Sequence, residues 1–375
     1  MIFGYVEKGE YGVWWRAIIQ MKIHIKLLLS IGLTLTSGLV CITAFGLFYQ
    51  SYFTPVHTAN NAKQTEEIQR INIIAVGDIM LSRNVARHAE KWGWPSWIWE
   101  NIHPFLLESD FNFWNLESPT NGTSVYSYEK TMIFNGLPEL ITTLKDMNFR
   151  VINLANNHAL DQGEVGLQTT QKILEAMNIT HIGTGTTQEE AWTPKIIEKN
   201  GIKIAFIGAS YAAYNDDGTR ESDMIARMQD AVMLEKSIQD AKTKADIVIV
   251  SMHAGTEYSR KTTELQEDFS HRAIDAGADL VIGAHPHWTQ RIESYKHGYI
   301  LYSLGNFVFD QEFSPETKSG LAAQIFIEKK KGITVIDRIL LHPIRIENYG
   351  QPRLMSGEEK IDALRAIDQE TDSLN

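Results

Sequence analysis

The sequence predicts an α/β fold whose sheet is covered on both faces by helices, behind one N-terminal transmembrane helix. From Ile71 onward, short apolar runs alternate with longer amphipathic segments. That alternation is typical of buried strands connected by helices. With 375 residues and a hydrophobic content of 43%, the chain can build a substantial core. Ahead of this region lies one uncharged stretch that is long enough to cross a bilayer.

The uncharged stretch covers residues 27–49 and is predicted to be a transmembrane signal anchor. Arg16, Lys22 and Lys26 precede it, so the positive-inside rule places residues 1–26 in the cytoplasm. The rest of the chain is then extracytoplasmic, held at the cell membrane by a single pass, with residues 50–70 as a linker. The alternative is a cleaved signal peptide, which would have a shorter apolar core and a small-residue cleavage site.

The apolar runs predict the strands, and the amphipathic segments between them predict the helices. Strands are predicted at 71–77, 111–116, 150–155, 202–209, 246–252, 280–283 and 299–304. The helices between them are predicted at 83–90, 138–147, 163–177, 230–244 and 264–276. Toward the end the pattern changes: 291–295 forms a hairpin with 299–304, and 321–329 and 334–343 are two further strands.

Charge and cysteine content exclude some classes of function and of metal site. The formal net charge of -11 argues against a nucleic-acid-binding protein, which normally carries a basic surface. The single cysteine, Cys41, excludes an internal disulfide. Any metal must therefore be held by His, Asp, Glu and Asn, a set that favours hard or borderline divalent ions.

Polar residues follow five of the predicted strands, at the point where each strand ends. In open α/β folds the carboxyl ends of strands converge on the ligand site, so these clusters can share one pocket. The clusters are Gly77-Asp78, Asn115-Leu116-Glu117, Asn156-Asn157-His158, His253 and His285-Pro286-His287.

These residue types suit a site that activates water with two metal ions. Such a site needs a carboxylate that bridges both ions, imidazoles and neutral oxygens that complete the shells, and an acid for the leaving group. Glu117 is the natural bridge, and His158 is left over as a possible general acid. The other candidate ligands are Asp78, Asn157, His253, His285 and His287. Taken singly, each has a structural alternative: a turn or helix cap for Asp78 and Asn157, and a buried core histidine for His253.

The order of these motifs resembles the CapA family, the capsule or poly-gamma-glutamate synthesis proteins, a branch of the calcineurin-like metallophosphoesterases. The resemblance covers about residues 71–345 and includes a similar N-terminal anchor. The matching motifs are Gly77-Asp78-Ile79-Met80, Asn115-Leu116-Glu117, Asn156-Asn157-His158-Ala159-Leu160-Asp161-Gln162-Gly163, Met252-His253-Ala254-Gly255, Gly283-Ala284-His285-Pro286-His287 and Tyr302-Ser303-Leu304-Gly305-Asn306-Phe307.

The resemblance implies a sandwich of two packed β-sheets flanked by helices over residues 71–345, with 346–375 as a C-terminal tail. It implies one or two divalent ions of Mn, Fe or Zn. Asp78 would hold the first ion together with His287, Glu117 would bridge, and His158 would be the acid near the leaving group. Asn157, His253 and His285 would hold the second ion. The wider superfamily usually begins with Asp-x-His, whereas this chain has Asp78-Ile79-Met80, so one ligand of the first metal is missing.

Arg83 and Lys130 are candidates for substrate binding. Arg83 lies one turn into the predicted helix after Asp78, where it can approach a bound phosphate or carboxylate, although a surface ion pair is the alternative. The resemblance suggests a substrate-side position for Lys130. Four tryptophans at positions 92, 94, 97 and 99 are expected to stack on sugars, to lie at a membrane interface or to pack as a partly exposed flap.

The resemblance and the predicted ligands together imply a metal-dependent phosphoester hydrolase in capsule or poly-gamma-glutamate biosynthesis. The alternative is a non-hydrolytic subunit of an exported-polymer synthase or transport complex, which binds an anionic polymer through the metal site. A third possibility is an amide or peptide hydrolase that uses the same activated water. The expected partners are the membrane, other membrane subunits of a polymer synthase, and an anionic polymer or phosphoester substrate.

Overall fold

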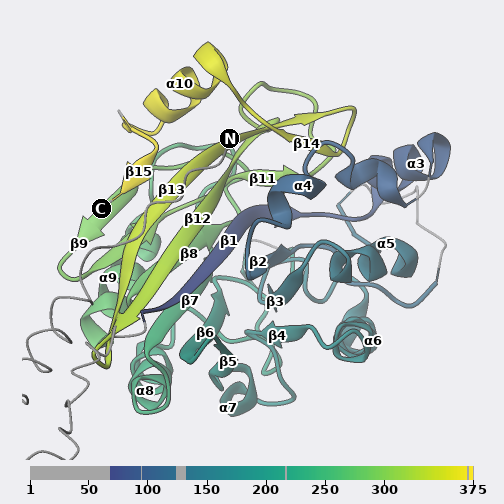
Figure 1. Cartoon of the computed structure of the whole chain (residues 1–375). Helices are drawn as coiled ribbons and strands as arrows, with labels where there is room; N and C mark the ends of the chain where they lie inside the picture. Colours follow the sequence, from purple (N-terminus) through teal and green to yellow (C-terminus); the bar gives the residue numbers. More distant parts are fainter. Residues whose placement is uncertain (1–67, 94, 124–131, 216–217, 370, 375) are drawn as a thin grey trace, which may run out of the picture. The chain divides into compact units, whose positions relative to one another are not determined.

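A computed structural model describes residues 68–375 except 94, 124–131, 216–217, 370 and 375 (Figure 1). The predicted anchor at 27–49 and Lys130 lie outside these residues. Among the described residues, none of the helices combines the length and apolar character needed to cross a bilayer.

The strands are β1 (Gln69–Ile79), β2 (Phe111–Leu116), β3 (Phe149–Asn153), β4 (Thr180–Ile182), β5 (Lys195–Lys199), β6 (Ile202–Ser210), β7 (Ile247–His253), β8 (Leu280–Ala284), β9 (Ile292–Tyr295), β10 (Gly298–Leu301), β11 (Asn306–Val308), β12 (Ser319–Lys330), β13 (Ile333–Glu347), β14 (Gln351–Leu354) and β15 (Ser373–Leu374). The helices are α3 (Arg83–Trp92), α4 (His103–Leu106), α5 (Pro138–Thr142), α6 (Gly163–Ala176), α7 (Gln188–Ala191), α8 (Ala231–Lys242), α9 (Glu264–Ala276) and α10 (Gly357–Arg365), with 3₁₀ turns at Ser96–Trp99 and Thr143–Lys145.

The strands form two mixed sheets. The first has the order β14-β13-β12-β1-β2-β3-β4, with β11 paired to β1 and β15 paired to β13. The second has the order β5-β6-β7-β8-β10-β9. In each sheet the strands that lead toward the polar clusters are parallel neighbours: β1 with β2 and β3 in one, and β6 with β7 and β8 in the other. The two-sheet α/β architecture implied by the resemblance is therefore confirmed.

Alternation along the central strands separates the core into layers. In β1, Ile71, Ile73 and Ala75 belong to the cluster shared by the two sheets, whereas Ile74 and Val76 belong to the cluster on the opposite face. Successive side chains of a strand point to opposite faces, so a strand buried on both sides reads as one continuous apolar run. Figure 1 shows α5 and α6 beside the first sheet and α8 and α9 beside the second.

Most predicted elements are confirmed, and the differences have local causes. The helix predicted at 138–147 is α5 followed by a 3₁₀ turn, and the strand predicted at 299–304 ends at Leu301 in β10. The elements that were not predicted from the sequence are β4, β5, β11, β14, β15, α4, α7 and α10. Among these, β4 and β11 are too short to show a period, and β5 contains charged residues because it is the edge strand of its sheet. Residues 351–354 and 373–374, within the stretch described as a tail, pair with β13.

Candidate metal centre

The two sheets bring the predicted ligands to one place at the ends of their strands. Asp78 lies near the end of β1, and Glu117 directly follows β2. On the second sheet, His253 ends β7, and His285 and His287 follow β8. All five side chains are buried. Residues separated by about two hundred positions in the sequence are thus neighbours in space, as the strand-end pattern predicts.

The buried acids and histidines form two groups that share one carboxylate. Glu117, His253 and His285 make one group, and Asp78, Glu117 and His287 make the other. Within each group the potential ligand atoms all lie within 4.8 Å of one another. A carboxylate has two oxygens and can therefore serve two neighbouring cations, and Glu117 is the residue that the two groups share.

Several of these ligand atoms are buried without a hydrogen-bond partner. Among the described residues, neither carboxylate oxygen of Glu117 has one, and the same holds for Nδ1 of His253 and Nδ1 of His285. A buried polar atom without a partner is unfavourable, and a buried carboxylate is especially so. Carboxylate oxygens and imidazole nitrogens are ligands for divalent cations, so the residues present fit a metal centre.

When no cation is present, both carboxyl groups keep their protons to a higher pH than usual, because their pKa values are raised. Burial raises the pKa of Asp78 to about 7, although hydrogen bonds from Asn115 and from the backbone N–H of His285 act in the opposite direction. Burial raises the pKa of Glu117 well above its usual range, and the charges of Asp78 and Glu257 add to the effect. A cation would offset both causes by stabilising the ionised carboxylates.

The histidines are held in the neutral form that metals bind. Burial lowers the pKa of His253 and of His285 well below the usual range, and the neighbouring imidazoles lower both further. Burial likewise lowers the pKa of His287 to about 3. The imidazole lone pairs are therefore available at neutral pH without loss of a proton.

Buried asparagines hold the strand ends of the first sheet together. Asn115 donates to Asp78 Oδ1 over 2.8 Å, and its own carbonyl accepts from Asn153 and Asn156 over 3.1 and 3.2 Å. Asn156 also accepts from the backbone N–H of His158 over 3.1 Å. This chain of bonds fixes the positions of Asp78 and His158 relative to each other.

The His285-Pro286-His287 turn is strained and anchored. Both histidines have positive φ, 99° and 58°, which is unfavourable for residues with a side chain and is found mainly where the surroundings impose it. The backbone N–H of His285 donates to Asp78 Oδ2 over 3.1 Å. His287 Nδ1 lies 2.9 Å from Asn306 Oδ1 and 3.6 Å from Asp78 Oδ2. The turn is thus tied to β1 and to β11.

Close backbone approach underlies this arrangement. A Cβ on Gly77 would lie 1.8 Å from the carbonyl oxygen of Gly305, and one on Gly283 would lie 1.9 Å from that of Tyr302. Only glycine at these two positions lets β1, which carries Asp78, and β8, which leads into His285, pack so closely against the chain just before β11.

Asn157 lies beside His253. Its Oδ1 is 2.8 Å from His253 Nε2, and its amide donates to Asn215 Oδ1 over 3.4 Å. The same His253 Nε2 lies 3.9 Å from Glu117 Oε1, so it faces the carboxylate that the two groups share. Asn157 Oδ1 therefore lies next to a potential ligand atom of the second group, and its role as a ligand stays a prediction.

His158 is held at the edge of the two groups by Asp161, which was not among the predicted site residues. Asp161 Oδ2 lies 2.7 Å from His158 Nδ1 and also accepts from the backbone N–H of Phe134. The Phe134 ring stacks on the imidazole at 4.0 Å. His158 Nε2 then lies 3.8 Å from Glu117 Oε1. The spacing of three residues between His158 and Asp161 was the available signal.

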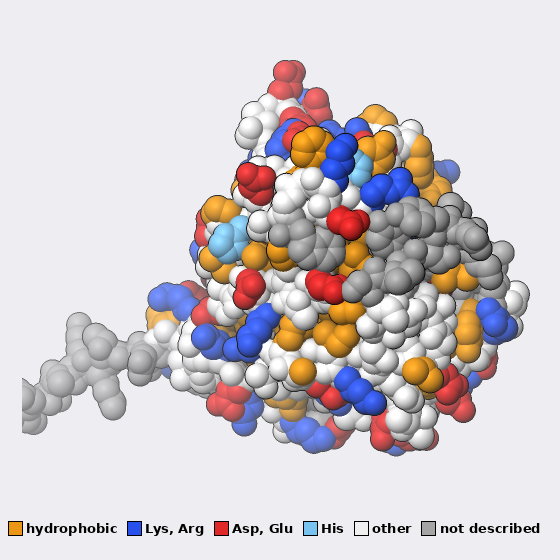
Figure 2. Space-filling model, turned by 90° about the vertical axis from the view of Figure 1, so that its right-hand side faces the viewer, with side chains coloured by type: hydrophobic (Ala, Val, Ile, Leu, Met, Phe, Trp, Pro, Cys, Tyr) orange, Lys and Arg blue, Asp and Glu red, His pale blue; other side chains and the backbone are white. Residues whose placement is uncertain are grey.

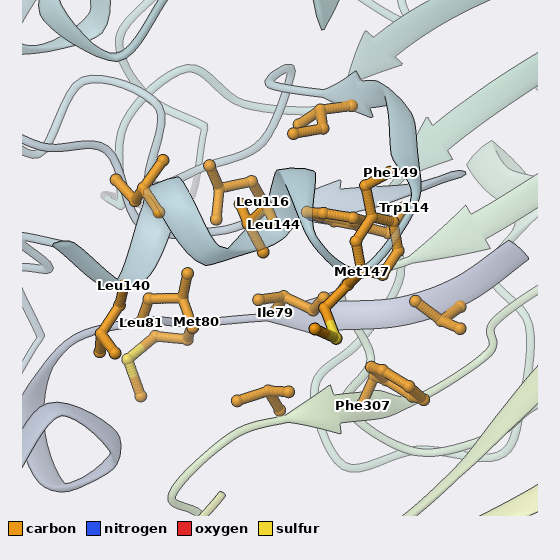
Figure 3. Packing of buried hydrophobic residues seen from close by; sticks show 14 of the residues in the cluster. Ile79, Met80, Leu81, Trp114, Leu116, Leu140, Leu144, Met147, Phe149 and Phe307 are labelled. Atoms are coloured by element: carbon orange, nitrogen blue, oxygen red, sulfur yellow. The ribbon is translucent and has the colours of Figure 1, made fainter. Parts of the chain in front are cut away.

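Met80 stands where the wider superfamily usually has a histidine, and it belongs to the core. Its side chain is fully buried in the apolar cluster on the helix-covered face of the first sheet (Figure 3). Its sulfur accepts from Ser82, from the backbone N–H over 3.2 Å and from the hydroxyl over 3.0 Å. Met80 therefore takes no part in either ligand group.

Arg83 lies near the site and is held in place. Its guanidinium pairs with Asp310, whose other oxygen accepts from the backbone N–H of Asn84 over 3.0 Å. It also lies over the Phe134 ring at 4.8 Å. Its charge lowers the pKa of Glu117 in part, which places it within electrostatic reach of the ligand groups. The ion pair that was the alternative to substrate binding by Arg83 is present, and it lies beside the ligand groups.

The tryptophans of the predicted cluster lie in different environments. Trp97 and Trp99 are buried, and Trp99 donates from its ring to Thr143 over 2.8 Å. Trp92 is exposed, with Lys91 over its ring, and Trp94 lies outside the described residues. Two of the four therefore pack in the core.

Figure 2 shows that the face turned toward the viewer carries charged side chains of both signs, scattered among hydrophobic and uncharged ones.

Comparisons with known proteins place this chain among bacterial capsule proteins. The family described as "Bacterial capsule synthesis protein PGA_cap" matches residues 72–311. The chain is 30% identical over 312 residues to the capsule biosynthesis protein CapA of Bacillus anthracis, covering 81% of this chain and 74% of that protein. It is 34% identical over 256 residues to the PGA biosynthesis protein CapA of Bacillus subtilis, covering 68% and 67%.

The solved structures similar to this chain include the calcineurin-like phosphoesterase YfkN from Bacillus subtilis. That match has a TM-score of 0.45 and 14% identity, and it covers 80% of this chain and 97% of that one. A hypothetical protein from Thermus thermophilus matches with a TM-score of 0.47 and 13% identity, over 74% of this chain and 100% of that chain.

Proposed function

The chain belongs to the family of bacterial capsule synthesis proteins PGA_cap, and from that premise we propose that it is a metal-dependent phosphoester hydrolase in capsule or poly-gamma-glutamate biosynthesis. We further propose that it is anchored in the cell membrane with its α/β domain outside. The observation that carries the hydrolase proposal is Glu117, a fully buried carboxylate that is shared by two ligand groups and lacks a hydrogen-bond partner among the described residues.

In this proposal Asp78, Glu117 and His287 hold one divalent ion, and Glu117, Asn157, His253 and His285 hold another. Mn, Fe or Zn suits this mixture of carboxylates and imidazoles. Such ions supply Lewis acidity and an activated water. Asn157 Oδ1 lies 2.8 Å from His253 Nε2, close enough for both to contact the same ion. Asn115 donates to Asp78 Oδ1 and keeps that carboxylate in position.

His158 is the proposed general acid. A hydrogen on Nδ1 directed at Asp161 fixes the ring and leaves Nε2 facing the shared carboxylate, 3.8 Å from Glu117 Oε1. In that orientation Nε2 can carry a proton toward a leaving oxygen. Arg83 is the proposed contact for the substrate anion, because its guanidinium is held between Asp310 and the Phe134 ring next to His158. Lys130 is proposed for the substrate side as well.

A second candidate function is supported by the names of the relatives. The proteins most relevant here are described as capsule or PGA biosynthesis proteins, words that name a process without naming a hydrolysis. The same buried site, loaded with cations, would then bind an anionic polymer for a membrane synthase or transport complex without turnover. An amide hydrolase is the third outcome that the experiment must separate.

The test is elemental analysis of the full chain, purified without chelators, together with assays on a generic aryl phosphodiester and on poly-gamma-glutamate. We expect one to two equivalents of Mn, Fe or Zn and release of the aryl alcohol. Bound metal without turnover of either substrate would favour the polymer-binding function. Release of glutamate would favour the amide hydrolase. Absence of metal after reconstitution would contradict every function that depends on this centre.

A further inference from the structure

Two exposed aromatic side chains lie next to His287, at the edge of the metal centre. Tyr258, in the loop after β7, stacks on the His287 imidazole with ring centroids 5.9 Å apart and an angle of 27°. Phe313, in the loop between β11 and β12, meets the Tyr258 ring edge to face at 5.1 Å and 84°. The two side chains are 37% and 66% exposed, respectively. Both rings thus offer surface to solvent beside a ligand group.

The backbone at Tyr258 is held in an unfavourable conformation. Its φ is 58°, and its N–H donates to the carbonyl of Pro286 over 2.9 Å, within the turn that carries both ligand histidines. Its hydroxyl accepts from Gln311 over 3.2 Å. A bulky residue with positive φ persists where the surroundings impose it, and such residues cluster at functional sites.

The loop that carries Phe313 is tied to the same histidine. Thr317 donates from its hydroxyl to the carbonyl of Gln311 over 2.7 Å, and Asn306 donates to the carbonyl of Thr317 over 2.8 Å. Asn306 Oδ1 in turn lies 2.9 Å from His287 Nδ1. The exposed Phe313 ring is therefore presented by a hydrogen-bonded loop at a defined distance from the metal centre.

We propose that Tyr258 and Phe313 form a subsite for a ring-bearing part of the substrate, joined to the anionic group that the metal centre takes. This inference rests on the proposed function and narrows its substrate class to esters of a group with a flat apolar face, such as an aryl group or a hexose. Single exposed hydrophobic residues are common on protein surfaces. Here two are paired, one has a strained backbone, and both are linked to a ligand of the centre.

The test measures binding to the metal-loaded full chain by isothermal titration calorimetry, with three non-hydrolysable ligands that carry the same anionic group. These are phenylphosphonate, a C-glucosyl phosphonate and methylphosphonate. Aromatic stacking predicts that at least one ring-bearing ligand binds roughly two- to tenfold tighter than methylphosphonate. The ring-bearing ligand that binds more tightly than methylphosphonate shows whether the subsite takes an aryl group or a sugar.

Phe313→Ala should remove most of this preference while leaving methylphosphonate affinity and metal content unchanged. Phe313→Tyr should restore it, because a flat ring returns. Ile333→Ala is the matched control: Ile333 is 69% exposed at the start of β13, near the hairpin end of the sheet where β1 begins. It should leave all three affinities unchanged.

Equal affinity for the three ligands would overturn the subsite and leave the proposed function intact. A ring preference that persists in Phe313→Ala would also overturn it, since the preference would then arise elsewhere. If none of the three ligands binds to metal-loaded protein, the subsite and the proposed phosphoester function fail together.

Discussion

Among single residues, Glu117 makes the strongest prediction. Glu117→Ala should remove both ions, because each ligand group loses its shared member. The fold should persist and the metal-free protein should melt at a higher temperature than the metal-free wild type, since the change removes a buried carboxylate without partners among the described residues. Elemental analysis and thermal denaturation measure the two effects. The exposed Glu198→Ala serves as the control, and wild-type metal content in Glu117→Ala would exclude the bridge.

His158 and Asp161 make a paired prediction at the same scale. His158→Ala should keep the metal and slow turnover by about 10²–10⁴-fold, the usual contribution of a general acid. Asp161→Asn should also keep the metal, and should slow turnover because an amide can donate to Nδ1 and favour the wrong tautomer. Metal analysis beside a pH–rate profile checks both. Loss of metal in either variant would mean that His158 is a ligand.

At the scale of elements, the fold was largely readable from the sequence because its buried strands are continuous apolar runs. The bounds of α9 agree with the prediction, and the helix carries clear end signals: a capping box at Thr263 and Gln266, and Gly277 in the left-handed conformation after its last residue. By contrast, β4 and β11 have three residues each, which is too few to show a period. The division into two sheets came from the family resemblance, because local patterns do not determine which strands pair.

The candidate site was also largely predictable from the sequence, because its residues follow the apolar runs that mark the buried strands. Strand ends locate Asp78, Glu117 and the histidines, since parallel strands converge at one edge. Most side-chain partners depend on tertiary contacts that spacing does not reveal. The contact between Asp161 and His158 had one local signal, their spacing of three residues, and was not predicted. The resemblance assigned Asn157 and His253 to the same ion, and these two side chains are in contact.

Gly77 allows a prediction about the end of β1. In Gly77→Ala the new Cβ would overlap the Gly305 carbonyl at 1.8 Å, so β1 and β11 must separate. We expect a loss of about 3 kcal/mol in the free energy of unfolding and weaker metal binding, because Asp78 moves with the strand. Gly332→Ala, at a positive φ of 78° with open space around it, should cost only about 1 kcal/mol and leave metal binding unchanged. Denaturant unfolding and metal titration separate the two variants.

For the whole molecule, the electrostatics of the centre connect metal binding to stability. The folded metal-free protein raises the pKa of Asp78 from 3.8 to about 7. It therefore binds more protons than the unfolded chain in this range, and the contribution of Asp78 to stability falls as pH rises from about 4 to 7. His287, with its pKa lowered from 6.5 to about 3, acts in the opposite sense: its contribution is present above pH 6.5 and is lost as pH falls toward 3.

Metal affinity should accordingly rise with pH through the titration of carboxylates, with no contribution from the histidines above pH 6. Below about pH 7 a cation must displace the proton of Asp78, so this group alone should increase the affinity about tenfold per pH unit, equivalent to about 1.4 kcal/mol of added stability at fixed excess metal. The raised pKa of Glu117 makes the total dependence steeper. Calorimetric melting of metal-loaded and metal-free protein at pH 6 and pH 8 measures the difference. Asp78→Asn should weaken binding and reduce its pH dependence to the part that Glu117 contributes, because the variant has no proton to displace at position 78. A pH dependence that is undiminished in Asp78→Asn and falls when His287 is replaced would instead assign the displaced proton to the histidine.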